Sequence, residues 1–261
     1  MGYFNIELKP TISGANCIAG IDAGDLLADW EVKTVPTKKA FKVLGATCIE
    51  RGTNGASQVS SYELIFASPD SDGTAPPSLG TVNDTINGTG FFRHLVGIYN
   101  VTATADTIDT VNVSSPDNTD GNQNPDLIIE PSRVVNADGS IKFDGHGVNG
   151  KICIGVTSQS GDPDFGTAVL VKGAIAADNT TTIPTDLQGS ANNDPNAENV
   201  FAVGDVLQTG TGDTVGTIAS IGTFGSQKQD ITLTANNVDA IADNEELCNI
   251  NPVTFIIHCE Y

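Results

Sequence analysis

Three histidines are the residues of this chain most often used as catalytic bases or metal ligands. His94 lies in Phe91-Phe-Arg-His-Leu-Val96, which reads as a strand, and His146 lies in an Asp-Gly-His-Gly turn. His258 precedes Cys259, but adjacent strand residues point to opposite faces, so the two are not expected to pair as base and nucleophile. The sequence has no His-x-x-x-His or His-x-His spacing, nucleophile elbow, phosphate-binding loop or dinucleotide fingerprint. We therefore expect no catalytic residue, no metal site and no cofactor.

The cysteines point to packing rather than to redox or metal chemistry. Their number is odd, they are widely spaced and none forms a Cys-x-x-Cys pair, which argues against a disulfide framework. Most of them stand beside an apolar residue, so we expect small buried side chains on strands. The five are Cys17, Cys48, Cys153, Cys248 and Cys259.

Carboxylates are abundant, with 32 Asp and Glu against 12 Lys and Arg and a net charge of −20. Asn118-Thr-Asp120-Gly121 matches the middle of a Ca²⁺ loop, but Pro116 takes the first ligand position and the closing Glu is missing. Asp243-Asn-Glu-Glu246 is a second anionic cluster. We interpret both as solvated acidic loops and leave Ca²⁺ binding open. A paired-acid glycosidase is disfavoured because one Trp and four Tyr offer few rings to line a sugar cleft.

The shortage of bases limits the partners of the chain. Phosphate contacts require clustered Lys and Arg, so we expect no nucleic-acid partner and no binding to an anionic membrane. No run approaches 18 apolar residues, and the first residues lack a basic stretch followed by an apolar core. We expect a protein that is made in the cytoplasm and used without export.

One basic cluster stands out, between Glu31 and Leu44. Residues 1–51 hold six bases and six acids, so the whole net charge falls within residues 52–261. The cluster is either the solvated face of an alternating strand or a docking face for an acidic partner surface, since complementary charge orients assembly. The segregated charge favours a protein with one face for a partner and one for water. The candidate partner-docking residues are Lys33, Lys38, Lys39 and Lys42.

The elements that position these residues read as short strands separated by turns. Thr, Asn and Gly number 28, 22 and 28, and no window shows a helical apolar period over three turns. We predict an all-β fold, an antiparallel sandwich or jelly roll, with surface loops at Ser68–Gly90 and Thr102–Pro131. The predicted strands are Tyr3–Leu8, Phe41–Glu50, Ser60–Ala67, Phe92–Val101, Ile141–Phe143, Lys151–Ser158 and Pro252–Tyr261.

The C-terminal third has shorter, glycine-punctuated strands, typical of a small barrel. We predict that residues 165–248 form a small β subdomain inserted into a main sandwich of residues 1–164 and 249–261. Ala23-Gly-Asp-Leu-Leu27 and Val203-Gly-Asp-Val-Leu207 are similar, and we interpret their Gly-Asp pairs as turns.

This third contains four segments of similar texture: Phe201–Leu207, Val215–Ile221, Ile231–Asn237 and Ala240–Leu247. They resemble segments of virion structural proteins of tailed bacteriophages, which include capsid decoration (cement) proteins and fibre components. The resemblance implies a non-enzymatic protein on the capsid surface of the virion, assembled in the host cytoplasm. Its partners would be the major capsid protein or other virion proteins, and homo-oligomers are common in such proteins. The alternatives are a receptor- or glycan-binding tail fibre or adhesin module and a carbohydrate-active enzyme.

Overall fold

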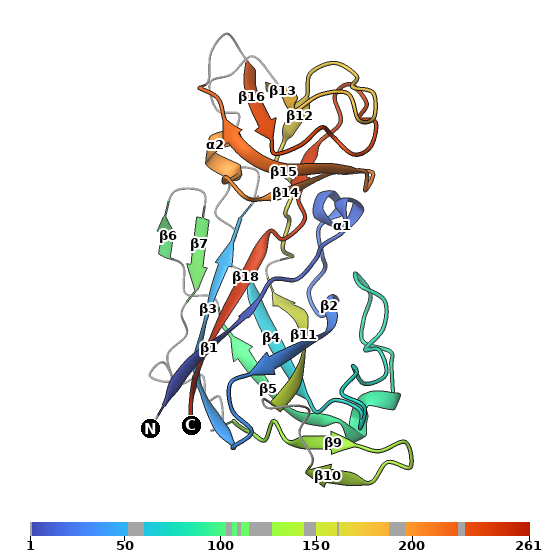
Figure 1. The fold of residues 1–261 in the computed structure, drawn as a ribbon, viewed down its shortest axis with the longest axis vertical. Coiled ribbons are helices and arrows are strands. Elements are labelled where there is room, and N and C mark those ends of the chain that lie inside the picture. Colours follow the sequence, from blue (N-terminus) through green and yellow to red (C-terminus); the bar gives the residue numbers. More distant parts are fainter. Residues whose placement is uncertain are drawn as a thin grey trace.

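The protein is built almost entirely from short antiparallel strands (Figure 1). The computed structural model describes residues 2–51, 60–102, 106–108, 111–114, 127–143, 150–160, 162–187, 197–223 and 228–261. Helix within these ranges is limited to α1 (Gly14–Ala19), α2 (Ala197–Val200) and the 3₁₀ turn η1 (Gly90–Arg93). No helix of the described ranges is long and apolar enough to cross a membrane. The predicted all-β antiparallel sandwich with a barrel-like part is confirmed.

Two antiparallel sheets form the sandwich in the lower half of Figure 1. One has the order β1–β18–β3–β7–β6, with β8 also on β3, and the other the order β2–β11–β4–β5. The first comprises β1 (Tyr3–Leu8), β3 (Phe41–Glu50), β6 (Asp106–Ile108), β7 (Val111–Ser114), β8 (Ile128–Ile129) and β18 (Val253–Glu260). The second comprises β2 (Leu26–Val35), β4 (Ser61–Ala67), β5 (Leu95–Val101) and β11 (Gly150–Ser160).

Side-chain alternation explains how these strands bury their apolar residues. Every second residue of β18 is buried, so Phe255, Ile257 and Cys259 face the core between the sheets while His258 faces outward. Strand β11 is buried on both faces, because the loop at 68–94 covers the outer face of its sheet. Leu79 from this loop packs over Gly155, where a β-carbon would lie 2.4 Å from the Leu79 side chain.

A third sheet forms the barrel-like upper part, with the order β12–β13–β16–β15–β14–β17. A bridge between Leu170 and Glu246 brings its two edges together, so the barrel is nearly closed. All buried residues of the barrel core lie between Val169 and Leu247, whereas the sandwich core includes Cys248 and Val253. The predicted boundaries of an inserted subdomain at 165–248 stay a prediction. Its strands are β12 (Val169–Val171), β13 (Thr182–Leu187), β14 (Val206–Thr209), β15 (Thr214–Ile221), β16 (Lys228–Leu233) and β17 (Leu247–Asn249).

Close contacts join the sandwich to the barrel. Helix α1 touches strand β14 at Gly14, where a β-carbon would lie 1.9 Å from the carbonyl oxygen of Thr209. Arg51, at the end of β3, forms an ion pair of 3.1 Å between its Nη1 and Oδ1 of Asp205. These contacts fix α1 and β3 against the base of the barrel.

The two similar Gly-Asp segments form the same turn in different sheets. Gly24 and Gly204 both have φ of +94°, a region that favours glycine. Gly24 N donates to Ser158 O, and Gly204 N donates to Ile218 O in the same way. The return bonds also match, because Ser158 N and Ile218 N donate to the carbonyl oxygens of Asp25 and Asp205. Each turn leads directly into a strand that contains buried residues. This geometry agrees with the interpretation of the Gly-Asp pairs as turns.

Three predicted elements need correction. The interpretation of the lysine cluster as one face of a single alternating strand does not hold, because β2 ends at Val35, before Pro36, and β3 starts in the other sheet. The strand expected at Phe92–Val101 starts at Leu95, because η1 occupies Gly90–Arg93. The loop expected at Thr102–Pro131 contains the short strands β6, β7 and β8.

Candidate docking surface

The predicted docking lysines lie on and around the turn that joins β2 to β3, at the lower end of the sandwich (Figure 1). Thr37 is buried and its Oγ1 accepts a hydrogen bond of 3.0 Å from Lys39 N, which fixes this turn. Lys38 and Lys39 are exposed, and neither forms an ion pair with a carboxylate among the described residues. The turn therefore presents two ammonium groups to solvent on a defined backbone.

The other two candidates are held differently. Lys33 lies on β2, and its Nζ is 2.7 Å from Oε2 of Glu31, so its charge is already paired. Lys42 lies on β3, half-buried, opposite Glu260 and Ile128 in the strand register. The structure thus brings the four lysines to one end of the sandwich and leaves Lys38 and Lys39 as the two freest charges among them.

Further bases from later in the sequence join this end, which the sequence division at residue 51 did not predict. We call it the basal end: the β2–β3 turn (36–40), η1 and the hairpin of β9 (Arg133–Val135) and β10 (Ile141–Phe143). Lys151 on β11 lies opposite Thr34 on β2 in the strand register. Arg93 Nη1 donates a hydrogen bond to the carbonyl oxygen of Asp138 in the hairpin turn. Eight of the 12 bases lie on or beside it: Lys33, Lys38, Lys39, Lys42, Arg93, Arg133, Lys142 and Lys151.

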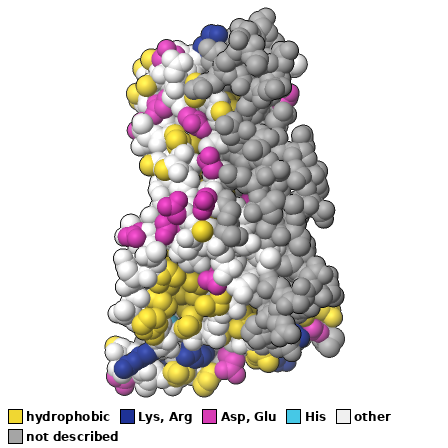
Figure 2. All heavy atoms as spheres, turned by 180° about the vertical axis from the view of Figure 1, so that it is seen from behind, with side chains coloured by type: hydrophobic (Ala, Val, Ile, Leu, Met, Phe, Trp, Pro, Cys, Tyr) yellow, Lys and Arg dark blue, Asp and Glu magenta, His cyan; other side chains and the backbone are white. Residues whose placement is uncertain are grey.

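The opposite end is acidic. Residues 165–248 contain 11 Asp and Glu but two Lys. In Figure 2, carboxylates are spread over the upper and middle parts of the face and recur at the bottom, while the largest hydrophobic patch and most of the visible Lys and Arg lie in the lower part. The bases are therefore concentrated at one end of the long axis, whereas acids occur along its whole length.

The buried histidine of the basal end has structural partners. His94 follows η1 instead of lying within a strand, and its Nδ1 lies 2.9 Å from the carbonyl oxygen of Ser68. Its Nε2 is 3.6 Å from Oδ1 of Asp70, and the Ser68 hydroxyl accepts a hydrogen bond of 2.6 Å from Arg133 Nη1. Ser, His and Asp thus meet here, but the imidazole contacts the Ser68 carbonyl rather than its hydroxyl. Sequence reasoning missed this cluster because its members come from three distant segments.

Of the other two histidines the structure describes His258, which pairs with no nucleophile. His258 lies between Thr47 Oγ1, at 3.1 Å from its Nε2, and Asn5 Oδ1, at 3.1 Å from its Nδ1. Cys259 points to the opposite, buried face of β18, as the alternation predicts. His146 lies outside the described residues.

All five cysteines are buried, and none of them forms a disulfide. This confirms the interpretation that they pack as small apolar side chains. Burial raises the pKa of Cys153 and that of Cys259 to about 12. Burial and the nearby Glu50 raise the pKa of Cys48 well above its ordinary value. These thiols are therefore protonated and poor nucleophiles at neutral pH.

The acidic segment at 243–246 works as a set of backbone caps. Glu246 Oε1 accepts from Thr167 N at 2.6 Å and from Ala168 N at 2.9 Å, and Asp243 Oδ1 accepts from Gly173 N at 2.6 Å. No group of three or more His, Cys, Asp or Glu in the described ranges is arranged to hold a metal ion. The other acidic candidate, at 118–121, lies outside those ranges.

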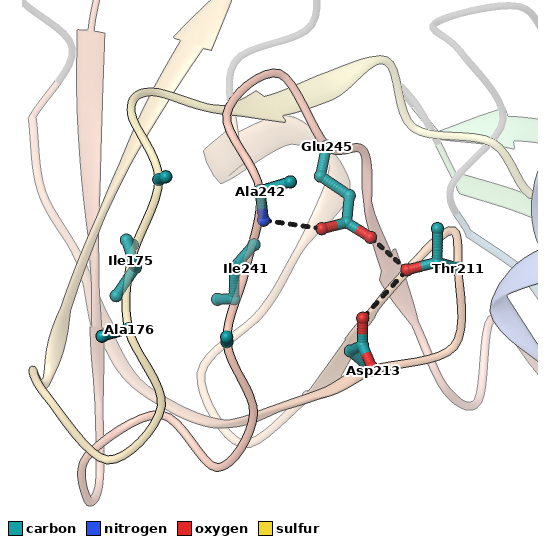
Figure 3. Close-up of a pocket in the computed structure, with 9 residues that line it drawn as sticks. Ile175, Ala176, Thr211, Asp213, Ile241, Ala242 and Glu245 are labelled. Atoms are coloured by element: carbon teal, nitrogen blue, oxygen red, sulfur yellow. Dashed lines mark hydrogen bonds between the residues drawn. The ribbon is translucent and has the colours of Figure 1, made fainter.

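An open groove of about 770 Å³ lies on the barrel beside Glu245 (Figure 3). Exposed alanines, Ala176 and Ala242 among them, line it above the buried pair Ile175 and Ile241. Burial alone would raise the pKa of Glu245, but hydrogen bonds from the Thr211 hydroxyl and Ala242 N hold its pKa below the ordinary value. Both carboxylate oxygens of Glu245 therefore accept hydrogen bonds that hold the Thr211 loop and the Ala242–Glu245 turn in place.

No protein-family model matches this chain, and no curated protein matches it.

Proposed function

We propose that this chain is a non-enzymatic structural protein of a tailed-bacteriophage virion that decorates the capsid surface. The resemblance in the C-terminal third suggests the class, and one structural observation supports docking as the activity. That observation is the separation of charge between the basal end, with its exposed Lys38 and Lys39, and the acidic barrel.

The mechanism follows from this separation. An acidic shell surface attracts the basal end and repels the barrel, so the chain docks with its barrel pointing outward. The acidic barrels then cover the particle and keep particles apart in solution. Because the chain binds the intact shell and not the disrupted one, its binding also raises the temperature at which the shell fails. The partner is the major capsid protein or another virion protein, and several copies act together.

Co-sedimentation with emptied shells of the phage that encodes the chain tests this function. The double variant Lys38→Glu/Lys39→Glu reverses the two exposed charges of the turn. Its matched control, Lys9→Glu/Lys172→Glu, makes the same charge change away from the basal end. We expect the wild-type chain and the control to sediment with the shells, and the turn variant to bind about tenfold more weakly or worse.

Two results would overturn the proposal. The first is a wild-type chain that stays in the supernatant at every shell concentration while binding host cells or glycans, which would indicate the receptor-binding alternative. The second is a turn variant that binds as well as the control.

A further inference from the structure

The β9–β10 hairpin presents an entire strand to solvent. All three residues of β10 are exposed, including the large apolar side chains of Ile141 (52%) and Phe143 (64%). Its partner β9 buries Val134 and Val135 completely or nearly so. Strand β10 thus adds no side chain to the described core, although a two-stranded ribbon is marginally stable by itself.

Hydrogen bonds that the ribbon donates to the rest of the sandwich hold it in place. Arg133 Nη1 donates to Ser68 Oγ at 2.6 Å and to His94 O at 3.1 Å. Val135 N donates to Pro69 O at 3.1 Å, and Asn136 N closes the turn onto Ser140 O at 2.9 Å. The exposed strand is therefore preorganised, which lowers the entropy lost when a partner binds it.

Other apolar surface surrounds the hairpin. The register places Ile141 and Phe143 on one face, alternating with Lys142. Phe92, next to the Arg93 that contacts the hairpin turn, is 62% exposed. A groove of about 390 Å³ also opens beside Arg133, lined by Leu95, Val96, Ile128, Glu130 and Arg133.

We propose that Ile141 and Phe143 are the apolar anchors of the docking surface, and that they insert into an apolar depression edged by carboxylates on the shell protein. This rests on the proposed function and adds the group that gives it affinity and specificity. Interfaces commonly place aromatic and aliphatic anchors in pockets and surround them with charged residues. The lysines of the β2–β3 turn at the same end require the partner to be acidic, and the acidic barrel prevents the same partner from binding at the other end.

A serine double variant, Ile141→Ser/Phe143→Ser, tests the anchors in the full chain. Its matched control is Val203→Ser/Val238→Ser, which removes two similarly exposed apolar side chains (68% and 56%) from the barrel region. Binding to emptied shells is measured at low salt and in about 0.5 M NaCl, where exposed charges are screened. We expect the anchor variant to bind at least about tenfold more weakly at low salt and to lose binding in high salt. The control should match the wild type, and circular dichroism should show all chains equally folded.

The outcomes separate the two proposals. If the wild type binds and depends on Lys38 and Lys39, but the anchor variant binds like its control, the anchor proposal is wrong and the docking function stands. If the wild type does not bind, both fail. If the isolated chain self-associates in sedimentation velocity and the anchor variant abolishes this, the occupant is a second copy and the shell-anchor proposal is overturned.

Discussion

Removing one hydroxyl group, with Tyr62→Phe, should destabilise the sandwich because that group hydrogen-bonds a buried carboxylate. Tyr62 on β4 donates to Glu50 on β3, which joins the two sheets, and both side chains are at most 2% exposed. The ring of Tyr62 packs edge-on against Phe255, with centroids 5.2 Å apart, and phenylalanine preserves this contact. The variant therefore isolates the hydrogen bond.

The magnitude follows from the charge and burial of the acceptor. Hydrogen bonds to charged groups contribute about 1.5–3 kcal/mol, and a buried acceptor left without its donor costs a similar amount. We expect Tyr62→Phe to lower the free energy of unfolding by about 2 kcal/mol, and the melting temperature by roughly 4–8 °C for a chain of this length. Urea denaturation measures the first value and calorimetry the second.

The same residue gives a pH dependence whose sign can be worked out. Burial, and then the charge of Glu50, raise the pKa of Tyr62 well above its ordinary 10.0, so the folded state keeps the phenol neutral. In the unfolded chain the phenol ionises near pH 10, so the stability due to Tyr62 is complete below that pH and declines above it. The wild type should therefore lose its advantage over Tyr62→Phe as the pH rises beyond about 10.

A matched control uses another tyrosine. Tyr3 on β1 is 68% exposed, so Tyr3→Phe should change stability by less than about 0.5 kcal/mol. In a double-mutant cycle, Glu50→Gln should reduce the cost of Tyr62→Phe, because the charge that needs the donor is gone. If Tyr62→Phe were as stable as Tyr3→Phe, the reasoning about a buried, hydrogen-bonded carboxylate would be refuted.

Three other predictions concern the junction and the thiols. Gly14→Ala should lower stability by about 2 kcal/mol or more, although alanine usually favours helices, because its β-carbon would meet Thr209 O at 1.9 Å; a stable variant would contradict the contact. Asp205→Ala should cost more than Arg51→Ala, about 1–2 against under 1 kcal/mol, since Asp205 also caps Ala202 N at 2.7 Å; chemical denaturation that gave the reverse order would refute this. Iodoacetamide at pH 8 should leave the native thiols unmodified and label all five after unfolding, as mass spectrometry can check; rapid native labelling would show that a thiol is accessible.

The sequence predicted best the long strands that lie inside their sheets. Strands β11 and β18 are long and rich in β-branched residues, and both are central in their sheets. Helix α1 was missed because six residues give no apolar period, and tertiary contacts of Gly14 and Cys17 hold the helix in place. Such contacts cannot be predicted from a single local segment.

The sequence predicted only the part of the candidate site that is continuous along the chain. The lysine cluster is continuous in the sequence, so it was visible before the structure, whereas Arg93, Arg133 and Lys142 reach the basal end only through folding. The exposure of Phe143 was also hidden, since an Ile-Lys-Phe run predicts a strand without saying that the strand lies in a two-stranded ribbon. The charge division at residue 51 therefore identified part of one end of the molecule rather than a complete face.

Imaging the bound orientation tests docking through the basal end most directly. Electron cryomicroscopy of the shells decorated with the chain, compared with bare shells, would reveal extra density at repeated positions of the lattice. We predict that the β9–β10 hairpin and the β2–β3 turn contact the shell and that the barrel is outermost. Density that places the barrel against the shell, or no added density at a saturating concentration of the protein, would contradict the proposed function.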